Sequence, residues 1–137
     1  MRGTVALAMT AARLPRTART GVAVSDPTGT IVRPLKPVER VDSKGGGAFL
    51  DRIIAAEAPE VIVVGEPRLM SGDVGEQAQL ARAFADRLRQ RVSIPVEMFD
   101  ERLTTVEASR RRAESASTTS IDSLAACVLL EAWLAAR

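Results

Sequence analysis

The chain has 137 residues, of which 46% are hydrophobic but only 3% aromatic, so we expect one domain over residues 1–137 with an aliphatic core. It has no histidine, which excludes Ser–His and Cys–His catalysis and histidine-ligated metals. The single cysteine, Cys127, excludes an internal disulfide, and its apolar helix neighbours favour a core position over a nucleophile. No apolar run approaches the roughly 18 residues of a membrane span, so we expect a cytoplasmic protein without a membrane segment.

The net charge of +2 is small, but the charges are unevenly distributed along the sequence. The segment before Asp26 contains arginines and no acid, whereas acids outnumber basic residues after Val41. A basic amino end beside an acidic body suits a protein that binds a polyanion and also holds a cation.

Periodicity and turn signals predict the elements in chain order. They are strands at 5–9 and 20–25, a turn at 26–29, a returning strand at 30–33 that Pro34 and Pro37 end, a helix at 48–56 after a flexible lead of three glycines, a buried strand at 61–64, a helix at 75–91, a strand at 96–99, a helix from 106, a polar loop at 115–120 and a helix at 121–136. Leu80, Phe84 and Leu88 should form the buried face of the second of these helices. This order predicts an α/β fold, a mixed sheet with helices on both faces.

Acidic side chains stand where two predicted strands end and where the last helix begins. Glu66 follows the buried strand, Asp100 and Glu101 follow the next one, and Asp122 opens the final helix. If these carboxylates converge on one edge of the sheet, Mg²⁺ or Mn²⁺ could hold them, as in two-metal nucleases. Simpler interpretations exist for each: a solvated loop acid, a strand-end pair beside Arg102, and an acid favoured by the helix dipole.

Four segments together resemble a known family. They are Gly-Val-Ala-Val-Ser-Asp-Pro-Thr-Gly at 21–29, Val-Val-Gly-Glu-Pro-Arg at 63–68 with Ser-Gly at 71–72, Asp-Glu-Arg-Leu-Thr-Thr at 100–105, and Ile-Asp-Ser-Leu-Ala-Ala at 121–126. In this order they resemble the YqgF/RuvX family, the Holliday-junction-resolvase-like nucleases with an RNase H fold. The resemblance spans about residues 20–135, and the last two segments are its most specific part.

The resemblance implies an RNase H-like α/β fold with a five-stranded mixed sheet flanked by helices. It also implies Mg²⁺- or Mn²⁺-dependent phosphodiester hydrolysis, acting on the 5′ end of pre-16S ribosomal RNA or on branched DNA such as a Holliday junction. Glu101 matches the family's second acid and Asp122 its third, both as metal ligands. A homodimer is plausible for a resolvase-like fold.

The chain departs from the family pattern at the first acid. The family's first strand ends in an aspartate, and that place is here Leu14 in an ungapped count or Met9 with a short insertion. Because this aspartate is the central metal ligand of RNase H folds, we predict feeble cleavage or none. A catalytically silent nucleic-acid-binding member is the alternative interpretation. A shifted reading frame before Gly21 is a third, which translation of the upstream DNA in the other two frames would test.

Two further departures concern Glu66 and the basic residues. Glu66 replaces the family's apolar residue between Gly and Pro, and related RuvC resolvases carry a catalytic glutamate near this strand end, so we count Glu66 as a third catalytic candidate. The loop at 115–120 is neutral where the family has a basic one. We therefore assign nucleic-acid contacts to Arg102 and to the basic triplet Arg110, Arg111 and Arg112.

Overall fold

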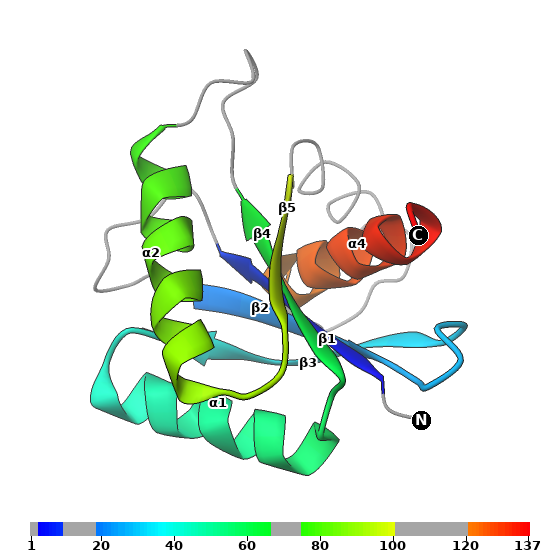
Figure 1. The fold of residues 1–137 in the computed structure, drawn as a ribbon, viewed down its shortest axis with the longest axis horizontal. Coiled ribbons are helices and arrows are strands. Elements are labelled where there is room, and N and C mark those ends of the chain that lie inside the picture. The colour runs from blue at the N-terminus through cyan, green and yellow to red at the C-terminus, as the bar shows by residue number, and fades with distance from the viewer. Residues whose placement is uncertain (1–2, 10–18, 67–74, 101–120) are drawn as a thin grey trace.

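A five-stranded mixed sheet forms the centre of the molecule in the computed structural model, which describes residues 3–9, 19–66, 75–100 and 121–137 (Figure 1). The strands are β1 (Thr4–Met9), β2 (Arg19–Ser25), β3 (Val32–Glu39), β4 (Val61–Glu66) and β5 (Val96–Asp100), in the order β3-β2-β1-β4-β5. β2 runs antiparallel to β1 and β3, whereas β4 runs parallel to β1 and β5. The predicted α/β class and the five-stranded mixed sheet are confirmed.

Three described helices cover the two faces of this sheet: α1 (Lys44–Glu57), α2 (Glu76–Arg91) and α4 (Ile121–Ala135). α1 and α2 lie on one face and α4 lies on the other (Figure 1). We call these the α1/α2 face and the α4 face. None of the helices in the described part of the chain is both long and apolar enough to cross a membrane.

Alternation along each strand sends successive side chains to opposite faces, and each face buries its own cluster. The cluster on the α1/α2 face contains large aliphatic side chains with Phe84: Val5, Leu7, Val22, Val24, Leu50, Ile62, Val64, Leu88 and Val96. The cluster on the α4 face contains many alanines with a few large side chains: Ala6, Ala8, Ala23, Val61, Val63, Ala125, Ala126, Cys127, Leu129, Leu130 and Trp133. Cys127 is 4% exposed, which confirms its predicted core position.

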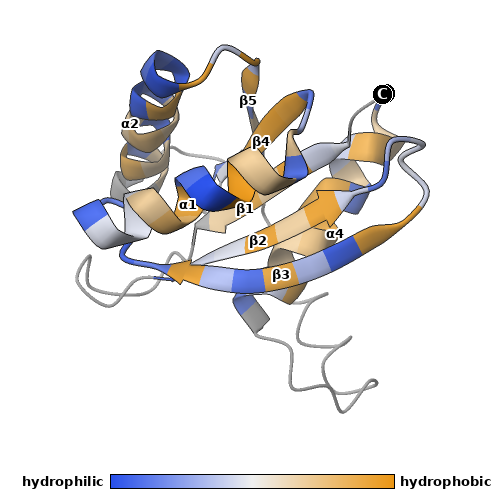
Figure 2. Cartoon of the chain, turned by 90° about the horizontal axis from the view of Figure 1, so that it is seen from below, coloured by the Kyte–Doolittle hydropathy of each residue, from blue (hydrophilic) through white to orange (hydrophobic). Residues whose placement is uncertain are grey.

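The prediction that Pro34 and Pro37 end the third strand is wrong, because β3 continues through both prolines to Glu39. β3 is an edge strand, and an edge strand tolerates a residue without an N–H on its open side. Its alternating hydrophilic and hydrophobic residues run along the margin of the sheet in Figure 2. The ladder with β2 has a register shift between Thr20 and Val22, close to the second proline's place on β3.

The three glycines predicted as a flexible lead lie instead inside the first turn of α1. The helix begins at Lys44, and the Ser43 side chain caps it by accepting a 3.0 Å hydrogen bond from the Gly46 N–H. A Cβ on Gly46 would lie 2.0 Å from the carbonyl oxygen of Arg40. The glycine therefore serves a close backbone contact between the helix start and the preceding turn.

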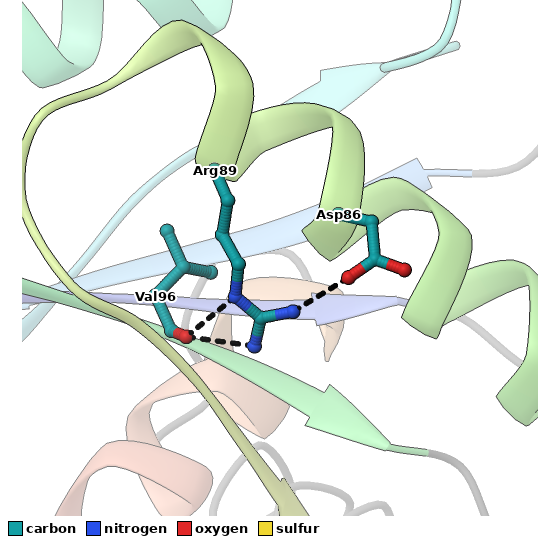
Figure 3. A network of polar contacts seen from close by, with 3 residues as sticks. All are labelled: Asp86, Arg89 and Val96. Atoms are coloured by element: carbon teal, nitrogen blue, oxygen red, sulfur yellow. Dashed lines mark hydrogen bonds and ion pairs between the residues drawn. The ribbon is translucent and has the colours of Figure 1, made fainter.

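The buried face of α2 is shifted from the one predicted, because one of its three predicted residues is exposed. Phe84 and Leu88 are buried as expected, but Leu80 is 44% exposed, and alanines at 78, 81 and 85 complete the buried stripe. Arg89 ties this helix to β5, because its Nε and Nη2 donate to the Val96 carbonyl at 3.1 and 2.8 Å (Figure 3). Its Nη1 also donates to Asp86 at 2.7 Å, which holds the guanidinium in place.

Candidate active site at the carboxyl edge of the sheet

The carboxyl ends of β1, β4 and β5 lie at the same edge of the sheet because these strands are parallel. Glu66 and Asp100, the last residues of β4 and β5, are register partners. β1 and β4 pair in a regular register that begins with Thr4 opposite Val61. When this register is continued to the ends of both strands, Met9 lies opposite Glu66. Met9, Glu66 and Asp100 therefore form a row across three strands, in which the β1 position carries no acid.

Glu66 is buried, and its carboxylate is paired with a cation from α2. It is 5% exposed and forms an ion pair with the guanidinium of Arg82, whose side chain is 46% exposed. The interpretation of Glu66 as a solvated loop carboxylate is wrong, because β4 extends to this residue and carries it under α2. A buried carboxylate requires such a partner, since its desolvation is otherwise costly.

Asp122 lies in the first turn of α4, on the opposite face of the sheet from the Glu66–Arg82 pair. Its backbone rests directly on β2: a Cβ on Gly21 would lie 1.8 Å from the Asp122 carbonyl oxygen. Gly21 in turn pairs with Ala8 of β1. Asp122 is thereby held close to the carboxyl end of β1, and its side chain is only partly exposed.

Ser123 fastens this helix start to two strands, a role that our sequence analysis missed. It is fully buried, and its hydroxyl accepts a 3.2 Å hydrogen bond from the Val22 N–H. The same hydroxyl donates to the Leu35 carbonyl oxygen at 2.6 Å. Its place beside Asp122 in a small-residue motif is the only signal in the sequence, since both partners are distant along the chain.

Several predicted site residues lie outside the described part of the chain. These are Glu101, Arg102, Arg110, Arg111 and Arg112, together with Leu14 and the helix predicted from residue 106. Within the described ranges, no three Asp, Glu or Cys side chains stand close enough together to hold a metal ion. The donors offered at this edge are carboxylate oxygens, whose chemistry fits Mg²⁺ or Mn²⁺ rather than a soft metal.

The strand order, the antiparallel β1–β2–β3 unit and the parallel β1–β4–β5 unit define an RNase H-like fold, the class that includes RuvC-like resolvases. The structure superposes on that of Thermus thermophilus RuvC in complex with a Holliday junction substrate with a TM-score of 0.59. That superposition covers 100% of this chain and 96% of the other at 14% sequence identity, so it supports the fold alone.

Within this class, the family model described as "RuvX: Holliday junction resolvase" matches residues 17–136. The chain belongs to the RuvX family. Relatives named "Putative pre-16S rRNA nuclease" include one from Rhodococcus opacus and one from Moorella thermoacetica. The one from Rhodococcus opacus is 42% identical over 130 residues, which cover 87% of this chain and 72% of the relative. The one from Moorella thermoacetica is 40% identical over 123 residues, which cover 83% and 85%.

Proposed function

We propose that this protein is a divalent-metal-dependent endonuclease of the RuvX type that acts on the 5′ end of pre-16S ribosomal RNA. The observation that carries the proposal is the placement of Asp122, whose backbone is fixed against β2 beside the carboxyl end of β1. An acid held at the carboxyl edge of a parallel strand group is where open α/β folds build their sites. The name of these relatives, "Putative pre-16S rRNA nuclease", supports RNA as the substrate. Branched DNA is the second candidate, supported by the description of the family model.

We assign the metal to Glu101 and Asp122. The two residues match the family's second and third acids, and β5, which ends directly before Glu101 in the chain, directs Phe99 to the α4 face, where Asp122 lies. When bound, Mg²⁺ or Mn²⁺ would activate water and neutralise charge on the scissile phosphate. The two carboxylates hold the cation.

Glu66 has a supporting role in this proposal. Its negative charge is balanced by Arg82, so the carboxylate does not depend on a metal for neutralisation. Glu66 would act as a catalytic acid only if a second acid stood beside it, at the β1 position of the row. Met9, its neighbour there, supplies none.

Cleavage by this chain should consequently be slow. Two-metal hydrolysis needs a carboxylate that holds the metal ion between the nucleophile and the scissile phosphate, and β1 offers only apolar and hydroxyl side chains. The register sets Met9 in the row with Glu66 and Asp100, and alternation directs Asp100 to the face opposite Asp122. The β1 residue on the face of Asp122 is Ala8, the partner of Gly21, so Ala8→Asp would place a carboxylate beside Asp122.

The experiment compares cleavage of precursor 16S ribosomal RNA and of a four-way DNA junction with Mg²⁺ or Mn²⁺. We expect Ala8→Asp to cleave the RNA at least about tenfold faster than the unmodified chain, since a carboxylate is supplied on the face of Asp122. Ala8→Asn is the matched control, because it has the same shape as Asp without the charge. Glu101→Gln or Asp122→Asn in the Ala8→Asp background should abolish the gain.

Three results would count against parts of this proposal. Fast metal-dependent cleavage by the unmodified chain would refute the slow-enzyme assignment. Preference for the junction would replace RNA by DNA as the substrate. Tight nucleic-acid binding with no cleavage even by Ala8→Asp would favour the catalytically silent alternative.

Binding should depend on Arg102 and on the triplet 110–112, which we assign to phosphate contacts. Each phosphate contact adds about 0.7 to 0.9 to the slope of log affinity against log salt. Replacing all three residues 110–112 with Ala should therefore weaken RNA binding and flatten this slope. Unchanged affinity and slope would make the triplet a solvated surface.

A further inference from the structure

The hydroxyl of Ser123 sits at the irregular point of the β2–β3 ladder. Between two paired positions β2 advances from Thr20 to Val22, while β3 advances from Val38 to Leu35, so β3 carries one extra residue. Such a bulge interrupts the regular hydrogen bonding between the strands. Ser123 connects the two strands here, accepting from Val22 at 3.2 Å and donating to Leu35 at 2.6 Å.

This single oxygen therefore joins three elements: α4, β2 and β3. Ser123 is fully buried, so water cannot replace its hydroxyl without a rearrangement of the helix start. The neighbouring Gly21 leaves no space between β2 and the Asp122 backbone, where an added Cβ would lie 1.8 Å from the carbonyl oxygen. Together the hydroxyl bridge and the close backbone contact leave the first turn of α4 a single position over the sheet.

We infer that Ser123 is a positioning residue, whose hydroxyl bridge across the β2–β3 bulge sets the place of the Asp122 carboxylate for cation binding. The inference rests on the proposed function, in which Asp122 is a metal ligand. Ser123 itself does not touch the metal or the substrate. Groups that orient a ligand from behind commonly change metal affinity about 10- to 100-fold when they are removed.

The test measures Mn²⁺ affinity by calorimetry on the full chain, at a temperature where circular dichroism shows each variant folded. Ser123→Ala should bind Mn²⁺ about tenfold or more weakly than the unmodified protein, and Ser123→Thr, which keeps the hydroxyl, should recover most of the loss. Asp122→Asn defines the signal that depends on the ligand itself.

Ser25→Ala is the matched control for a merely structural effect. Ser25, in β2, is likewise a buried serine, and its hydroxyl accepts a 3.0 Å hydrogen bond from the Thr4 N–H. It lies at the opposite end of β2 from Gly21. We expect it to lower the melting temperature without weakening Mn²⁺ binding. Ser123→Ala should lower both.

The outcomes separate the inference from the proposed function. Asp122-dependent Mn²⁺ binding that Ser123→Ala leaves unchanged, or weakens no more than Ser25→Ala does, overturns the inference and leaves the proposed function standing. An unmodified protein whose Mn²⁺ binding is absent, or unaffected by Asp122→Asn, overturns the proposed metal site and the positioning role with it.

Discussion

The two faces of the sheet are built by different means. On the α1/α2 face, large aliphatic side chains interlock, and arginines of α2 form ion pairs with acids around α1, as Arg87 does with Asp42 and Arg91 with Asp51. On the α4 face, alanines line the strands and the helix, and at Gly21 the backbone of one element meets the backbone of the other. One face is held through long side chains and the other through close backbone approach.

This difference indicates which face can hold a functional group accurately. A contact through long side chains can adjust by rotamer changes, whereas a backbone seated on a glycine has no such freedom. Asp122 is carried by the second kind of contact, and the Glu66–Arg82 pair is carried by the first. The α4 face thus positions the proposed ligand, while the α1/α2 face supplies most of the bulky apolar packing.

The largest effect should come from Gly21→Ala, which tests the close approach on the α4 face. The new Cβ would meet the Asp122 carbonyl oxygen at 1.8 Å, so α4 must move away from β2. We expect the free energy of unfolding to fall by about 3 kcal/mol or more, at the upper end of overpacking effects. Chemical denaturation measures this change.

Gly45→Ala is the control for that substitution. Gly45 lies in α1, and nothing stands within 4 Å of the place its Cβ would take. The same change should there stabilise the protein by up to about 1 kcal/mol, since Ala is the better helix former. Equal effects at the two glycines would contradict the difference between the faces.

Arg82→Ala should have the next largest effect, on the α1/α2 face. It leaves the buried Glu66 carboxylate without this cation, which we expect to cost about 2 kcal/mol, less than for a fully buried pair because Arg82 is half exposed. Adding Glu66→Leu should restore most of the stability, because the buried charge is gone. If the double variant stays as unstable as Arg82→Ala, the ion pair is not the cause.

The order and type of the elements followed from the sequence, because alternation and helical periodicity are local properties of the chain. The wrong predictions concern residues whose conformation or burial depends on their position in the fold rather than on their neighbours in the sequence. Prolines within β3 are tolerated only because that strand is at an edge, and Gly46 of α1 is required by a carbonyl of the preceding turn. Leu80 fitted the helical period, but alanines at 78, 81 and 85 took the buried side of α2.

The acids of the candidate site were chosen from the sequence, whereas the residues that hold them in place were not. Asp122 was identified from its motif, and Glu66 from its place after a strand. The sequence had no signal for the cation on Glu66, because Arg82 belongs to another element. The bridge made by Ser123 had no signal beyond the place of this residue beside Asp122, since its partners are 88 and 101 residues away along the chain.

Arg89→Ala tests how far side-chain contacts secure β5 on the α1/α2 face. The substitution removes two hydrogen bonds to the Val96 carbonyl and one to Asp86 (Figure 3). We expect a loss of about 1 kcal/mol in unfolding free energy, because the guanidinium is partly exposed and water can replace part of its contacts. Asp86→Ala, which keeps both bonds to Val96, should cost less. A larger loss from Asp86→Ala would assign the effect to the helix pair instead.

The smallest effect should come from Asp26, which lies in the turn between β2 and β3. This turn lies close to the end of α4, because a Cβ on Gly29 would be 3.3 Å from the Leu134 side chain. Hydrogen bonds from the Thr28 hydroxyl and from the backbone N–H groups of Ile31 and Thr30 hold the pKa of the Asp26 carboxyl below its usual value of 3.8. A carboxyl with a lowered folded-state pKa stabilises the fold above its unfolded pKa and loses that contribution as the pH falls through the folded value. The stability gap between the unmodified protein and Asp26→Asn should therefore be constant above about pH 5 and should shrink below the unfolded pKa of 3.8. Denaturation curves at a series of pH values measure the gap, and one that widens toward low pH would refute the assignment.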